Sequence, residues 1–116
     1  MATRGTKGRF NVGTLGLAGG TVTGASNAAT LNASSGKITT ESVSTAAGAT
    51  YTETLTNSFI AAADIVMASV TTTGTGEPVM TKVTPAAGSC VFIVRNNHAA
   101  TAFNAALVIS FTVFKQ

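Results

Sequence analysis

The sequence predicts an all-β domain, either an antiparallel β-sandwich or a jelly-roll-like fold, preceded by an extended, glycine-rich N-terminal arm. Three observations lead to this prediction. Thr supplies 21 of the 116 residues and Trp is absent, and the β-branched Thr side chain favours pleated strands. From about residue 30, short runs of β-forming residues are separated by Gly, Ala, Ser, Asn or Pro. Seven of the 12 Gly residues lie within the first 24 positions.

Residues 1–28 are expected to form the arm, because a segment so rich in Gly has few side chains that could build a core. It also carries apolar residues that a fully solvated tail would not need: Phe10, Val12, Leu15, Leu17 and Val22. We therefore expect the arm to become ordered against a neighbouring subunit, with a frayed, functionless end as the alternative. Its glycines follow neither the collagen triplet nor the pattern of a phosphate-binding loop.

Residues 29–116 are expected to form the sandwich, and the first strand candidates in this domain are residues 37–43 and 50–59. In the second of these runs, Tyr51, Glu53 and Leu55 fall on one face and Thr residues fill the other. This period of two is typical of a strand that buries one face.

The next two runs, 64–73 and 79–84, are separated by Gly and Pro residues, and we expect a hairpin to connect them. Residues 89–96 form the following run, in which Cys90 and Phe92 share one face with other apolar residues. Apolar residues also occupy the opposite face, so both faces of this strand are expected to be largely covered.

The last run, 106–116, is expected to be a central strand because one of its faces is wholly apolar. That face consists of Leu107, Ile109, Phe111 and Val113. Six or seven strands at spacings of about 10 to 15 residues favour a sandwich or jelly roll over an α/β fold. Helix is expected only as a turn or two near residues 57–64 or 97–105.

The chain's only Cys and only His, Cys90 and His98, are eight positions apart in mostly extended chain, so we do not expect them to touch. Cys90 is expected to be a buried, unreactive core residue. His98 follows Asn96 and Asn97, which favour a turn, and is therefore expected in a loop. Its functional alternative is a pH-sensitive contact at a subunit boundary.

The sequence predicts neither an enzyme nor a bound cofactor or metal. One His, one Cys and four scattered carboxylates do not make a metal site. Glu41 and Glu53 could in principle form a carboxylate pair for hydrolysis, but no base with an orienting group accompanies them.

Only 9% of the residues are charged, so copies of the chain repel one another weakly and we expect a homo-oligomer. The net charge of +3 comes from Arg4, Lys7 and Arg9, because the remaining charges cancel. These three residues and Phe10 are the expected partner-binding residues. We expect the three basic residues to contact acidic groups of a protein partner. Nucleic acid is less favoured because a wider basic face or more stacking aromatics would be required.

No membrane-spanning segment is predicted. The most apolar long stretch, 59–70, is about twelve residues and is interrupted by Asp64, whereas a spanning helix needs roughly 20. The basic start of the chain passes directly into Gly and polar residues, so no secretory signal is expected either. A single Cys fits synthesis in a reducing compartment.

Two stretches, residues 30–60 and 83–113, resemble small virion proteins of tailed bacteriophages that decorate or cement the outside of the head. The likeness lies in the Thr- and Ala-rich strands, the connectors TAAGATYT and TPAAGS, and the loop RNNHAATAFN. The resemblance implies a β-rich domain, often trimeric, that sits where capsomers meet and clamps them. It implies no residue with a defined chemical role.

The expected function is therefore that of a capsid decoration or cement protein, made in the host cytoplasm and located on the outer surface of the head. The expected partners are the major capsid protein and further copies of the chain, with a trimer favoured. A tail, fibre or host-recognition module is the alternative. The single Tyr and the absence of Trp leave little for an aromatic platform that could bind a glycan.

Overall fold

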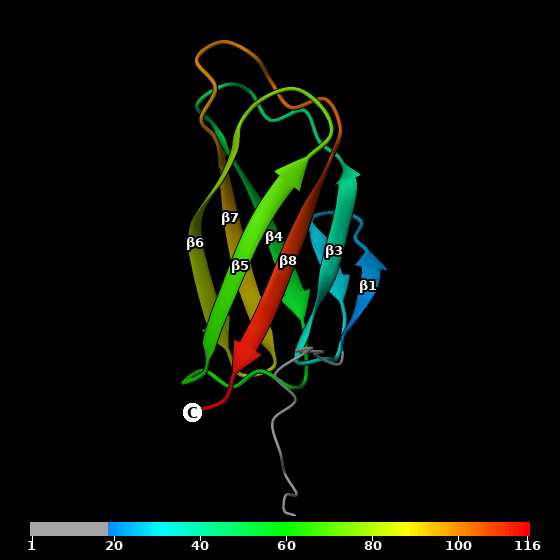
Figure 1. The fold of residues 1–116 in the computed structure, drawn as a ribbon, viewed down its shortest axis with the longest axis vertical. Helices are drawn as coiled ribbons and strands as arrows, with labels where there is room; N and C mark the ends of the chain where they lie inside the picture. Colours follow the sequence, from blue (N-terminus) through cyan, green and yellow to red (C-terminus); the bar gives the residue numbers. More distant parts are fainter. Residues whose placement is uncertain (1–18) are drawn as a thin grey trace, which may run out of the picture.

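The computed structural model describes residues 19–116, which form a sandwich of two four-stranded sheets (Figure 1). The strands are β1 (Gly19–Thr23), β2 (Ala28–Thr30), β3 (Ser35–Ser42), β4 (Thr50–Thr56), β5 (Ile65–Thr72), β6 (Pro78–Ala86), β7 (Ser89–Asn96) and β8 (Ala106–Phe114). One sheet has the order β1-β3-β8-β5 and the other β2-β4-β7-β6. The described residues contain no helix, including the two places where a helical turn was expected. The predicted all-β sandwich is confirmed.

Both sheets are mixed, because residues 19–30 add a parallel strand to each. β1 pairs in parallel with β3 and β2 in parallel with β4, whereas the other four pairs are antiparallel. The chain crosses from one sheet to the other between Thr23 and Ala28. The last third of the segment expected as an arm therefore contributes a strand to the sandwich, and residues 1–18 lie outside the described part.

The hairpin expected between residues 64–73 and 79–84 is not formed, because β5 and β6 belong to different sheets. β5 pairs with β8 and β6 pairs with β7, so residues 73–77 bridge the space of about 10 Å between the sheets. A hairpin joins β6 to β7 instead, where Ala86 pairs with Ser89. Its two-residue turn contains Gly88 with a φ of 79°, a conformation that favours glycine.

The core lies between the two sheets and follows the alternation of the sequence. Its largest contributions come from β4, β7 and β8, whose inward-facing apolar residues are Tyr51, Leu55, Cys90, Phe92, Val94, Leu107, Ile109, Phe111 and Val113. The rings of Phe92 and Phe111, from opposite sheets, pack with centroids 6.3 Å apart and a tilt of 39°. β8 lies between β3 and β5, as expected for a central strand.

One buried amide ties together the loops at one end of the sandwich. Asn96 is fully buried, and its Nδ2 donates hydrogen bonds to the carbonyl oxygens of Thr45 and Thr101, at 3.1 and 2.9 Å. Its Oδ1 accepts hydrogen bonds from the backbone N–H groups of Glu77 and His98. These partners belong to three different loops, so a single side chain fixes the shape of this end.

Candidate interaction surface

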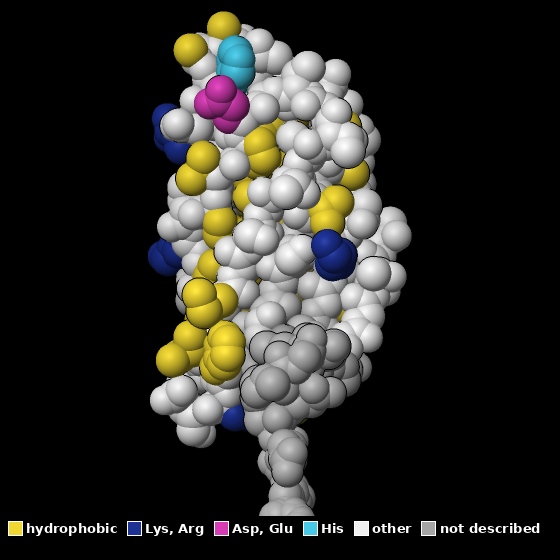
Figure 2. All heavy atoms as spheres, in the orientation of Figure 1, with side chains coloured by type: hydrophobic (Ala, Val, Ile, Leu, Met, Phe, Trp, Pro, Cys, Tyr) yellow, Lys and Arg dark blue, Asp and Glu magenta, His cyan; other side chains and the backbone are white. Residues whose placement is uncertain are grey.

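An apolar patch lies on the outer face of the β1-β3-β8-β5 sheet, where β5 begins and β8 ends. Ile65, Met67 and Phe114 are 51%, 62% and 48% exposed there, and we call these three residues the β5–β8 patch. Ile65 pairs directly with Phe114 across the two strands, and Met67 pairs with Thr112 in the next outward-facing row. Figure 2 shows hydrophobic side chains gathered at this end of the face. Exposed apolar residues that adjoin one another in this way mark interaction sites more often than isolated ones do.

The charges beside the patch are already paired. Nζ of Lys115 lies 2.6 Å from Oδ2 of Asp64 and also donates a hydrogen bond to the carbonyl oxygen of Phe59. The same ammonium lies 4.9 Å from the centroid of the Phe59 ring. The hydrogen bond from Lys115 lowers the pKa of Asp64, assisted by backbone N–H donors. A partner that covers the β5–β8 patch would therefore find Asp64 and Lys115 already paired with each other.

Two shallow hollows extend across the same face from the patch. One, of about 300 Å³, is lined by β5 and β8 and includes Met67, Ser69 and Ser110. The other, of about 440 Å³, lies over β8, β3 and β1 and includes Gly36 and Lys37. Apolar and hydroxyl residues share the first lining, and small hydroxyl and glycine residues dominate the second. Such open hollows suit the protruding side chains of a partner protein better than a small ligand, which is normally enclosed.

β5 is the least protected edge of the sandwich. None of its eight residues is Pro or charged, and within the described residues it pairs only with β8. By contrast, the β6 edge carries Pro78, Lys82 and Pro85 and an irregular register between Met80 and Lys82. The remaining edges, β1 and β2, are only five and three residues long. Prolines, charges, bulges and short lengths all discourage further strand pairing, so β5 is the edge open to another strand.

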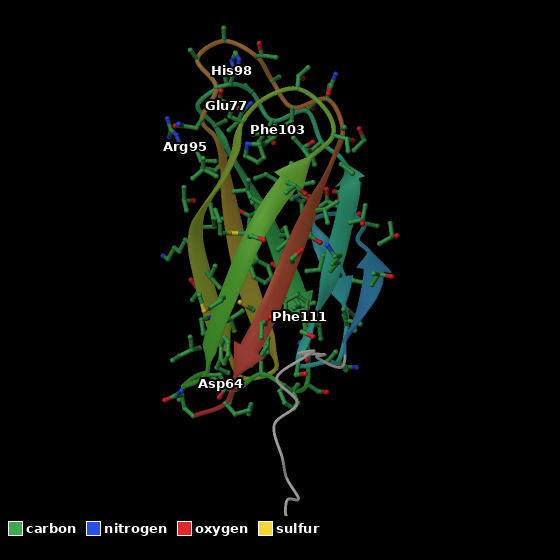
Figure 3. The ribbon with its side chains drawn as sticks, viewed as in Figure 1. Asp64, Glu77, Arg95, His98, Phe103 and Phe111 are labelled. Carbon is green, nitrogen blue, oxygen red and sulfur yellow. The ribbon has the colours of Figure 1, made fainter. Side chains whose placement is uncertain are left out.

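The structure does not bring Cys90 and His98 together. Cys90 lies near the start of β7 in the core, where burial raises the pKa of its thiol to about 11, so it is not a reactive thiolate. His98 lies in the loop after β7, at the end of the molecule opposite Asp64 (Figure 3). Its Nδ1 accepts hydrogen bonds from the N–H groups of Ala100 and Thr101, so this ring shapes its own loop.

Glu41 and Glu53, in contrast, do meet, on either side of the Tyr51 hydroxyl. Oη of Tyr51 lies 2.7 Å from Oε1 of Glu53 and 3.0 Å from Oε1 of Glu41. Glu53 is completely buried, so a substrate cannot reach it for hydrolysis. The period-of-two pattern predicts that Tyr51 and Glu53 share one face of their strand, but the approach of Glu41 from the other sheet is a tertiary contact that no local pattern signals.

Burial and hydrogen bonding move the pKa values of these two carboxyl groups in opposite directions. Burial raises the pKa of Glu53, and the nearby charge of Glu41 adds to this effect, against the hydrogen bond with Tyr51. Burial also acts to raise the pKa of Glu41, but hydrogen bonds from backbone N–H groups and from Tyr51 outweigh it and lower the pKa. Burial and the two carboxylates raise the pKa of Tyr51. Of the two carboxyl groups, Glu53 is therefore the one that keeps its proton more readily.

The expected partner-binding residues, Arg4, Lys7, Arg9 and Phe10, lie outside the described part of the chain. The point at which their segment joins the domain is defined, however. Gly19 pairs with Ser35, Ser35 with Thr112, and Thr112 with Met67, all in one row across the sheet. This row spans three strand spacings, about 14 Å. The N-terminal segment thus joins the sandwich at the end that bears the β5–β8 patch.

Residues 19–116 contain no cluster of three or more His, Cys, Asp or Glu side chains that could hold a metal ion. In this part of the chain no helix is long and apolar enough to cross a bilayer. Comparisons with protein-family models, with curated proteins and with solved structures found no match.

Proposed function

We propose that this chain is a structural protein of a phage particle, a capsid decoration or cement protein that binds the major capsid protein and clamps neighbouring capsomers on the outside of the head. The observation that carries the proposal is the β5–β8 patch. It lies on a hydroxyl-rich sheet face with few charges, at the end where the segment bearing Arg4, Lys7, Arg9 and Phe10 joins the domain.

The patch and the N-terminal segment suit two contacts made at once. Burying Ile65, Met67 and Phe114 would stabilise docking by about 0.8–1.5 kcal/mol for each side chain that becomes fully covered, because each is already about half buried. The first 18 residues, fully extended, could reach about 60 Å beyond the sandwich, which allows their basic and aromatic residues to bind a second capsomer. Two weak contacts joined in one chain give a durable attachment through their effective concentration.

We further propose that several copies act together, with a trimer as the expected assembly. In such a ring the open edge of β5 would meet a different surface of the neighbouring copy, because pairing of β5 with β5 gives only a twofold dimer. Strand pairing at this edge would satisfy backbone groups that now face solvent. The low charge of the chain leaves little repulsion between copies. An oligomer would also present several β5–β8 patches to the capsid, which strengthens binding without any new kind of contact.

The end of the sandwich opposite the patch supports the alternative, a tail, fibre or host-recognition module. Its loops are held in one shape by Asn96 and present Glu77 and His98, and Arg95 lies beside them at the end of β7, as Figure 3 shows. Loops fixed on a rigid scaffold are common recognition sites. An aromatic platform for sugars is lacking, however, because Tyr51, the chain's only Tyr, is buried.

Co-sedimentation with purified, expanded phage heads that lack the chain tests the function. We expect the wild-type protein to bind and to stay bound at high salt, because apolar contacts are not screened. The double variant Ile65→Ser and Met67→Ser should bind at least about tenfold more weakly, since the loss of 1.4 kcal/mol already gives that factor. Val79→Ser is the matched control, because Val79 is a comparably exposed apolar residue on the other sheet.

Three outcomes would contradict the proposal. Equal binding by the double variant and the wild type would show that the β5–β8 patch is not part of the interface with the head. Binding to the host envelope but not to heads would favour the recognition module. Binding to DNA that falls steeply with salt would indicate a nucleic-acid partner.

A further inference from the structure

The two hydrogen bonds at the Tyr51 hydroxyl need two hydrogens, and the hydroxyl itself provides only one, so one of the two neighbouring carboxyl groups must be protonated. The Tyr51 hydroxyl has a single hydrogen, yet its oxygen lies within hydrogen-bond distance of Glu53 Oε1 and of Glu41 Oε1. It can donate to only one of them. The other contact is a hydrogen bond only if that carboxyl group is protonated and donates to Tyr51.

Glu53 is the carboxyl group that carries this proton. It is 0% exposed, and its Oε2 is a buried oxygen without a hydrogen-bond partner, an environment that penalises a carboxylate strongly. Glu41 is partly exposed, and its Oε2 accepts a hydrogen bond of 3.0 Å from the backbone N–H of Asn27. The charged form is therefore favoured at Glu41 and the neutral form at Glu53.

The chain segment 24–27 closes directly over these side chains as it crosses between the sheets. A Cβ atom on Gly24 would lie 2.6 Å from Oε2 of Glu53, so the close approach requires glycine at this position. The segment is attached to both sheets: Gly24 N–H donates to the carbonyl oxygen of Thr39 on β3, and Thr54 N–H on β4 donates to that of Asn27. Asn27 itself has a left-handed φ of 64°.

We propose that Glu53, Tyr51 and Glu41 form a proton-dependent latch on residues 24–27. The Glu53 carboxylic acid donates a hydrogen bond to Tyr51, Tyr51 donates one to Glu41, and Glu41 accepts one from the Asn27 N–H. Loss of the Glu53 proton therefore loosens residues 24–27. After ionisation, Oε2 of Glu53 would be a charged oxygen without a donor beneath Gly24. Tyr51 could then satisfy only one of two carboxylates. Opening of the segment admits the water that the second carboxylate needs.

Few other groups can influence this proton. Among the described residues, the titratable side chains that face Glu53 are Glu41 from β3 and Tyr51 from β4. β7 places the apolar Phe92 opposite Glu53, and the crossing segment adds no charged side chain. Since no cation among residues 19–116 contacts Glu53, ionisation would leave its charge without a partner in this part of the chain.

The sign of the pH dependence follows from the raised pKa of Glu53. The folded state binds this proton more tightly than the unfolded state, so the closed segment has its full stability below the unfolded pKa, about 4.3. That stability is lost as the pH rises through the folded pKa. The latch thus favours a closed segment in acid and a looser one as the pH increases, and it does not depend on the proposed function.

Hydrogen exchange on the full chain tests the latch. Protection factors, corrected for intrinsic exchange, would be measured from about pH 5 to about pH 9 for the amides of Gly24, Ala28 and Thr54. We expect their protection to fall with rising pH, by about tenfold for each pH unit above the folded pKa of Glu53. The amide of Asn57, which donates to Gly88 away from the latch, should show no such fall.

Glu53→Gln separates the latch from a general loss of stability, because the Gln amide can donate to Tyr51 but cannot ionise. This variant should keep the segment protected across the whole pH range, whereas Glu77→Gln, in the loop between β5 and β6, should behave like the wild type. Protection of the wild type that does not change with pH, or that changes equally in Glu53→Gln, would overturn the proposal. Should the variant fail to fold, the pH titration of the wild-type Glu53 carboxyl group, followed by its ¹³C resonance, tests the latch instead. Titration at or below the ordinary pH range of a glutamate would also refute the latch.

Discussion

Ile65 and Phe114 lie directly opposite each other on β5 and β8, and each exposes about half of its surface. This pair is the corner of an apolar surface that continues to Met67, next to the unprotected edge of β5. A sheet edge that is free of charge and Pro and adjoins exposed apolar side chains is the part of this molecule most open to association.

Charges placed on the β5 edge should therefore weaken self-association. We expect Met67→Lys combined with Ser69→Lys to shift the oligomer towards monomer by at least about tenfold in dissociation constant, because association would then bury two new charges that have no partner. Val79→Lys on the β6 edge, which already carries Lys82, is the control and should leave the assembly unchanged. Sedimentation velocity over a range of concentrations measures both. An oligomer that persists unaltered in the β5 variant would exclude this edge from the interface.

Removing the Asn96 side chain should destabilise the protein strongly. Asn96→Ala leaves two carbonyl oxygens and two N–H groups in three loops without their buried partner, and we expect a loss of about 3 kcal/mol in the free energy of unfolding. The neighbouring Asn97 is exposed, and Asn97→Ala should change stability by less than about 0.5 kcal/mol. Urea denaturation of both variants makes the comparison. Similar midpoints for the two would show that the loops do not depend on Asn96.

Two glycines with positive φ should respond differently to substitution by Ala. Gly76 has a φ of 91°, and a Cβ atom there would lie 2.5 Å from the buried ring of Phe103. Gly88 has a φ of 79°, but no atom within 4 Å of its Cβ position. Gly88→Ala should cost about 1 kcal/mol from backbone strain alone, and Gly76→Ala about 3 kcal/mol because the ring must also move. Thermal unfolding by calorimetry would rank them; the reverse order would contradict the packing described at Phe103.

The ion pair at the end of β8 should stabilise the fold above acidic pH. Because the hydrogen bond from Lys115 lowers the pKa of Asp64, this contribution is present above the unfolded pKa of about 3.9 and is lost as the pH falls through the folded pKa. Asp64→Asn should therefore have a lower melting temperature than the wild type at neutral pH and a smaller decline in acid. Melting curves from about pH 2 to about pH 7 measure the difference. Parallel acid declines in the two proteins would rule out this role for Asp64.

Much of the fold could be predicted because side-chain alternation is a local property of a strand. The inward face of β4 with Tyr51, Glu53 and Leu55, the buried Cys90 of β7 and the central position of β8 all follow from a period of two. The partition of β5 and β6 into different sheets could not be read in this way. Each strand carries the same kind of pattern, and the pattern does not identify which distant strand will pair with it.

The sequence by itself determined that the chain forms short strands and which face of most of them is buried. It also determined that few residues are charged, so that electrostatic repulsion between copies is weak. Only the tertiary structure decided that residues 19–30 become parallel strands, that Glu41 meets Tyr51 and Glu53, and that Ile65 meets Phe114. The reason is physical: burial of one strand face depends on neighbours in sequence, whereas these contacts join segments far apart in the chain and form only when the two sheets pack.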